Sequence, residues 1–169
     1  MTARKFGRGL VLFLRYFVAA FFTFAAINKW RENYLFSDRL YQILSERLLE
    51  IDPESFGAWF IEHIGLPYYQ PMAWMVCWGE TFIALGLLFG VMTRGAAIGA
   101  VLFNVMLTIG GYYDASLIVL TLMYLPMVFL PTGQWVGLDR RLSQRYPGAP
   151  LFAGGRRRAP RRQGGAGGA

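Results

Sequence analysis

The 169-residue sequence is poor in the side chains that most redox and metal centres use. It contains one cysteine, Cys77, and one histidine, His63. These counts exclude a Cys-x-x-Cys redox pair, an internal disulfide, a cysteine-ligated zinc or iron–sulfur centre and bis-histidine haem ligation within the chain. We therefore expect neither a covalently bound cofactor nor a metal site. Any electron transfer then needs a dissociable organic carrier or a cofactor on another subunit.

Charged residues are scarce as well. They make up 16% of the chain, against about a quarter of an average soluble domain. Apolar residues account for 55%, and the mean hydropathy is +0.36. Between Pro71 and Leu138 the only charged residues are Glu80, Arg94 and Asp114. Such long uncharged stretches predict a polytopic membrane protein.

Four apolar stretches are long enough to cross a bilayer or nearly so, and they cover about 10–27, 71–92, 95–111 and 115–130. The connections near 94 and 112 are short enough to be tight turns. Because a helix satisfies its own backbone groups in lipid, the pattern predicts an all-α integral membrane protein. Its expected fold is an antiparallel bundle of four transmembrane helices, which forms one domain over residues 1–146.

The distribution of lysine and arginine predicts the orientation. Basic residues on one side of the predicted bundle are Arg4, Lys5, Arg8, Arg94, Arg140, Arg141 and Arg145, together with the arginines between 156 and 162. By the positive-inside rule both termini are cytoplasmic and the loop 28–70 is external. The membrane is expected to be a bacterial-type plasma membrane. A cleaved signal peptide is the alternative for the first stretch. Arg15 interrupts that stretch and no small-x-small site follows it, which favours a retained helix.

The external loop is expected to carry two short amphipathic helices. Apolar residues recur at helical spacing between 38 and 50. Asp52 as an N-cap, followed by Pro53, predicts the start of a second helix, and Gly65 predicts its end. His63 on this helix is expected to be interfacial rather than catalytic.

The last segment, 147–169, consists almost entirely of glycine, alanine, proline and arginine. This composition cannot build a core and predicts a disordered basic cytoplasmic tail. We expect the tail to contact anionic lipid rather than nucleic acid.

Polar side chains inside the predicted spans are the candidate functional residues, because each is costly in a bilayer. Glu80 lies about 18 Å from the inner face at 1.5 Å per residue, too deep to reach it. Other polar groups expected near that depth are Thr23, Asn104, Thr108, Thr121 and Tyr124. One hypothesis is a ligand or proton site, in which Glu80 handles a proton and Asn104, Thr108, Thr121, Tyr124 and Arg15 bind the ligand. The alternative is that Glu80 is protonated and, with these groups, only holds the helices together. For Arg15, an anchor at the inner interface is equally open.

Three stretches resemble the DoxX/DoxD family of four-helix membrane proteins. They are Arg15-Tyr16-Phe17 leading into Ala25-Ala26-Ile27-Asn28-Lys29-Trp30, the run from Gly79-Glu80 to Thr93-Arg94, and Gly133-Gln134-Trp135-Val136-Gly137-Leu138-Asp139. The chain departs from the family at Ala19, Ala20 and Ala25, where members often have glycine. Many members of the family have no known activity.

The resemblance implies a membrane subunit of a quinone-linked oxidoreductase, with a quinone as its cofactor and a second protein subunit as its partner. The long aromatic loop is similar to that of the DoxD branch, which contains the small subunit of thiosulfate:quinone oxidoreductase. Thiosulfate or another reduced sulfur compound is therefore the expected electron donor. The alternative function is a non-enzymatic scaffold or assembly factor that docks a partner through the external loop. Transport ranks third, since one buried carboxylate gives little evidence of a path.

Overall fold

The computed structural model describes residues 2–112 and 114–146, and it confirms the all-helical fold expected from the sequence. No strand occurs among those residues. The helices are α1 (Thr2–Arg31), α2 (Arg39–Glu50), α3 (Phe56–Phe60), the π-helix η1 (Ile61–Gly65), α4 (Tyr69–Phe89), α5 (Thr93–Ile109), α6 (Ala115–Phe129), α7 (Thr132–Trp135) and α8 (Asp139–Arg145). The predicted tail, 147–169, lies outside the described residues.

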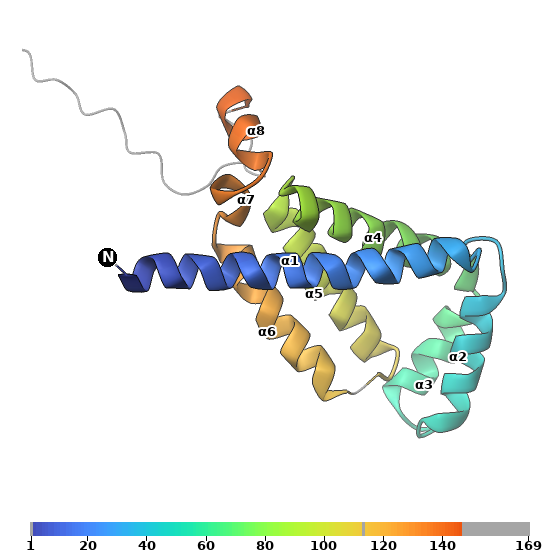
Figure 1. Ribbon diagram of the computed structural model, residues 1–169. Coiled ribbons are helices and arrows are strands. Elements are labelled where there is room, and N and C mark those ends of the chain that lie inside the picture. Colours follow the sequence, from blue (N-terminus) through green and yellow to red (C-terminus); the bar gives the residue numbers. More distant parts are fainter. Residues whose placement is uncertain (1, 113, 147–169) are drawn as a thin grey trace, which may run out of the picture.

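Four long helices form the body of the molecule (Figure 1). α1 packs against α4 and α6, and α5 packs against α4 and α6. Two of the four, α1 and α4, are long and apolar enough to cross a membrane, whereas α5 and α6 are shorter apolar helices. The first helix also extends beyond the predicted span 10–27 at both ends.

The ends of α4 and α5 that the 90–92 turn joins are in close contact. A Cβ atom on Gly86 would lie 2.7 Å from the Cβ of Ala96, so only glycine fits there. Beside this contact the core is formed by apolar side chains from all four helices, including Val18, Leu87 and Met127. From the turn, α4 and α5 diverge (Figure 1).

Helices α2, α3 and η1 form a cap over the end of the body where α1 finishes (Figure 1). The cap buries its own side chains Leu40, Leu44 and Ile61. Its Arg47 donates a hydrogen bond to the carbonyl of Gly111, between α5 and α6. The predicted helix over 38–50 is confirmed as α2. The start of the second helix is different from the prediction: Ser55, not Asp52, is the N-cap, because its hydroxyl accepts from the Ala58 amide.

At the opposite end, α7 and α8 fold back onto the turn between α4 and α5. Asp139 is buried, and its carboxylate accepts hydrogen bonds from the amides of Met92 and Thr93 and from the Thr93 hydroxyl. Met92 has a φ of 49°, in the left-handed region that a side chain disfavours. The Asp139 contacts therefore hold a strained turn in place.

Candidate site in the cavity beside Lys29 and Glu80

The centre of the candidate site is an ion pair between α1 and α4. The Nζ of Lys29 lies 2.8 Å from Oε1 of Glu80. The Glu80 side chain is only 4% exposed, and that of Lys29 is 22% exposed. A lone charge in an apolar interior is costly, so each charge stabilises the other here. The carboxylate is thus paired, an arrangement that neither hypothesis drawn from the sequence included.

Neighbouring side chains position the pair. The indole N–H of Trp30 donates to the Thr81 hydroxyl at 3.0 Å, which fixes α1 against α4 one residue beyond each member of the pair. The Lys29 ammonium also lies 5.5 Å from the centre of the Tyr34 ring. Burial and the nearby Glu80 carboxylate raise the pKa of Tyr34 to about 12, so this phenol stays neutral.

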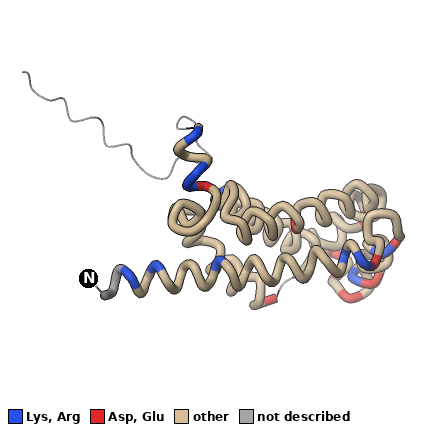
Figure 2. Tube along the Cα trace, turned by 45° about the horizontal axis from the view of Figure 1, so that its top comes forward, with Lys and Arg blue, Asp and Glu red and all other residues tan. Residues whose placement is uncertain are grey.

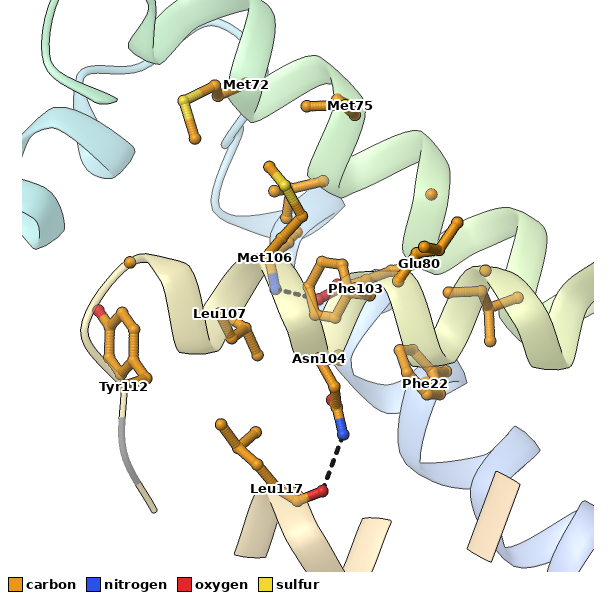
Figure 3. Close-up of a pocket in the computed structure, with 18 of the residues that line it drawn as sticks. Phe22, Met72, Met75, Glu80, Phe103, Asn104, Met106, Leu107, Tyr112 and Leu117 are labelled. Carbon is orange, nitrogen blue, oxygen red and sulfur yellow. Dashed lines mark hydrogen bonds and ion pairs between the residues drawn. The ribbon is translucent and has the colours of Figure 1, made fainter. Parts of the chain in front are cut away.

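The pair lines a cavity of about 560 Å³. All four long helices contribute to its wall, and α2 and Phe60 cover the end under the cap. The lining is mostly apolar, with three methionines, Met72, Met75 and Met106, on facing sides of α4 and α5 (Figure 3). Proteins bind small organic ligands in cavities of this size and character, in which a few polar groups fix the orientation.

Asn104 lines the cavity, but both of its amide N–H groups are already used. They donate to the Leu117 carbonyl and to the Thr121 hydroxyl, each at 3.0 Å, so Asn104 joins α5 to α6 (Figure 3). Thr121 in turn donates to the backbone of α6. Thr108 donates to the carbonyl of Asn104 one turn back along α5. Neither threonine lines the cavity.

Two buried oxygen atoms of residues that line the cavity have no hydrogen-bond partner within the described parts of the chain. They are Oε2 of Glu80 and the hydroxyl of Tyr124. Tyr124 lies close to Asn104, but the contact between their side chains does not have the geometry of a normal hydrogen bond. Buried polar atoms are rarely left unpaired, so both atoms are candidates to meet a ligand.

Arg15, the remaining predicted site residue, lies away from this cavity. Its guanidinium is fully buried and donates to the carbonyls of Thr132 and Val136 at 2.9 and 2.7 Å, and to the Tyr16 hydroxyl. These contacts tie α1 to the α7–α8 segment. The arginine therefore serves the fold at the opposite end of the molecule from the cap.

Comparison with known proteins identifies the family. The model of the DoxX family matches residues 10–112, which is more than half of the chain. The chain belongs to the DoxX family. The match includes both Lys29 and Glu80, and it ends before α6. Neither the curated proteins nor the solved structures gave a match. DoxX membership together with the long apolar helices α1 and α4 indicates a membrane protein of the DoxX type.

Several residues of the DoxX cavity are not among the candidates predicted from the sequence. Lys29 falls within the predicted external loop, and its partner Glu80 is 51 positions away. The available signal was its neighbourhood, since Lys29 lies two residues after the apolar stretch 10–27 and directly before Trp30. Tyr34 also lies in the predicted external loop, so its depth does not mark it as a candidate.

Proposed function

We propose that α1, α4, α5 and α6 cross a bacterial-type plasma membrane in alternating directions, with both termini cytoplasmic and the cap external. Two contacts support opposite directions for α1 and α4. Lys29, near the end of α1, lies beside Glu80, whereas Arg15, earlier in α1, lies beside Gly90, which follows Glu80 in the chain. The charges support the orientation. Basic residues occur along the N-terminal part of α1 and on α8, while acidic and basic residues are mixed in the cap (Figure 2).

Within that membrane the protein acts as a subunit of a quinone-linked oxidoreductase and binds the quinone ring in the cavity. The observation that carries this proposal is the buried Lys29–Glu80 pair in the wall of an otherwise apolar cavity. A quinone has the matching chemistry, because its ring is apolar and its oxygens need polar partners. The cavity volume lies within the range of about 300–1,000 Å³ found for organic ligands.

Three residues of the cavity have separate roles in this proposal. Tyr124 donates a hydrogen bond from its unpaired hydroxyl to one quinone oxygen. Asn104 does not take this role, because both of its amide N–H groups already donate to other groups of the chain. Glu80 exchanges a proton with the other oxygen through Oε2. Lys29, which is partly exposed, stabilises the carboxylate and connects it to the surface. Reduction of a quinone takes two electrons and two protons, and this chain supplies only a path for protons.

The electrons come from a donor outside the chain. A second protein subunit or a directly bound reduced sulfur compound, with thiosulfate as the first candidate, fits this requirement. The single cysteine, Cys77, is buried in α4 and does not line the cavity. No thiol chemistry of this chain therefore enters the proposal.

The test is quinone reduction by membrane vesicles that contain the protein and are given thiosulfate. Wild-type vesicles should reduce added quinone, and vesicles without the protein should not. Glu80→Gln should remove most of this turnover, because an amide cannot titrate. Thr108→Val, a change at an exposed position outside the cavity, is the matched control and should retain turnover. Equal rates with and without the protein would contradict the proposal, as would a fully active Glu80→Gln variant.

A scaffold that docks a partner remains the second candidate function, and one observation favours it. Phe56, Trp59 and His63 form an exposed stack on the cap, with ring centres 5.6 and 5.3 Å apart. Exposed aromatic rows are typical of protein interfaces as well as of membrane surfaces. If the scaffold function is correct, Trp59→Ser should lose a co-purifying protein, while Glu80→Gln should not.

A further inference from the structure

Helices α4 and α5 leave an opening between them, and both contribute methionines to the cavity. At the 90–92 turn α4 and α5 are in contact, since a Cβ on Gly86 would meet Ala96 at 2.7 Å. One turn further, a Cβ on Gly99 would lie 3.5 Å from Ile83. Two turns before Gly86, a Cβ on Gly79 would have no atom within 4 Å. The gap between the helices therefore widens steadily away from the turn.

The widening gap forms a groove, which we call the α4–α5 groove. Its lining residues are Met72, Met75 and Gly79 of α4 and Gly99, Leu102 and Met106 of α5. They recur at three- and four-residue steps, so each set forms one stripe along its helix. Met72 and Met106 extend from the two helices into the space between them (Figure 3).

The groove is apolar and open on its outer side. Met75 is 56% exposed and Leu102 is 59% exposed, although both line the cavity. The end under the cap is covered instead by Leu40 and Leu44, which are buried. Since the proposed bilayer surrounds α4 and α5, the open side faces hydrocarbon and the closed side faces the cap.

We infer that the α4–α5 groove holds the hydrocarbon tail of the cavity's ligand, and that the ligand enters sideways from the bilayer. The inference rests on the proposed function and adds the class of quinone: an amphiphile with a long alkyl or isoprenoid chain. Its head lies at the Lys29–Glu80 pair, the polar end of the cavity, and its tail runs along the methionines toward lipid. Unbranched thioether side chains suit this role, because they adapt to a flexible chain.

Gly79 provides the test, because it lines the cavity and a Cβ there would have no atom of the protein within 4 Å. Two probes are compared in nanodiscs: a dimethoxy-methyl-benzoquinone without a tail, and the same quinone with a decyl tail. Each affinity is expressed as the ratio of variant to wild type, which cancels the effect of tail length on partitioning. Gly79→Leu should weaken decyl-quinone binding about tenfold or more and change tailless binding by less than about twofold. Gly9→Leu, at another glycine with no atom within 4 Å of its Cβ, lies outside the cavity and should change neither.

The outcomes separate the two proposals. If the wild type binds neither probe, the proposed function fails. If it binds both, and Gly79→Leu weakens both equally or weakens neither, the quinone site stands and the tail groove is wrong.

A second measurement uses only the wild type and so does not depend on how the variant folds. A decyl-quinone with a diazirine at the end of its tail should label peptides from α4 and α5 on illumination. Labels confined to α2, α3 or η1 would overturn the inference, because the tail would then lie under the cap.

Discussion

Lys29 and Glu80 are 51 positions apart in the sequence, yet their side chains meet at 2.8 Å in the wall of the cavity. The two partners are unequally buried. Glu80 has almost no contact with solvent, whereas Lys29 reaches the surface with about a fifth of its side chain. The cost of breaking the pair therefore depends on which partner remains.

Removal of the lysine should be the more damaging change. Lys29→Met leaves a buried carboxylate without its counter-charge and should lower the free energy of unfolding by about 3–5 kcal/mol. Glu80→Gln should cost less, because the remaining ammonium is already partly solvated. The double variant Lys29→Met/Glu80→Gln should be more stable than Lys29→Met alone. Thermal unfolding in detergent measures all three, and a double variant as unstable as the sum of the singles would contradict the pairing.

The position of the buried Arg15 guanidinium should not tolerate even a conservative substitution. Nη1 of Arg15 donates to the carbonyls of Thr132 and Val136, while Nη2 donates to the Tyr16 hydroxyl. The single ammonium of lysine cannot reproduce this two-nitrogen geometry. Arg15→Lys should lower the free energy of unfolding by about 2 kcal/mol. Arg31→Lys, at an exposed position near the end of the same helix, is the control and should leave stability unchanged. Equal melting temperatures for Arg15→Lys and wild type would exclude a structural role.

Gly133 should tolerate no side chain. A Cβ there would lie 2.0 Å from the Thr93 hydroxyl oxygen and 2.1 Å from Oδ2 of Asp139, so it would force these groups apart. Gly133→Ala should cost about 1–3 kcal/mol, the usual range for overpacking. Gly95→Ala is a matched control, because the nearest atoms to its Cβ are Met92 carbons at 3.9 Å. Hydrogen exchange at α8 should increase in the first variant and not in the second.

Asp114 should make the stability of the fold depend on pH in the acidic range. It is the N-cap of α6, and hydrogen bonds from the Ser116 amide hold the pKa of its carboxyl below the ordinary value. A lowered folded-state pKa stabilises the fold above the unfolded pKa, and this contribution is lost as the pH falls through the folded value. Asp114→Asn keeps a capping acceptor but cannot titrate. Its melting temperature should therefore fall less than that of wild type as the pH decreases below about 4. Parallel pH profiles would contradict this assignment.

Much of the fold could be predicted from the sequence, because apolar stretches and their interruptions report directly on helices. The helix over 38–50 also followed from its periodicity and is present as α2. The start of α3 was misplaced, since Asp52 and Ser55 are both good caps. Only the packing of the folded chain decides between them. In that packing Gly57 of α3 lies against Gly111, between α5 and α6.

The site was harder to predict than the fold. Depth in a predicted span pointed to Glu80, Asn104 and Tyr124, and all three line the cavity. Depth alone grouped Thr108 with them, although side chains at one depth can point to different sides of a helix. Partners such as Lys29 for Glu80, or Asp139 for Thr93, join distant segments and have no local signature.

The central claim, that this cavity binds a membrane quinone, is tested most directly by the lipid content of the purified protein. The protein is extracted in a mild detergent, and the ratio of quinone to phospholipid in the sample is compared with that of the source membrane. The account predicts about one retained quinone per chain and an enrichment of about tenfold or more over the membrane, as specific binding requires. A ratio equal to that of the source membrane would contradict it.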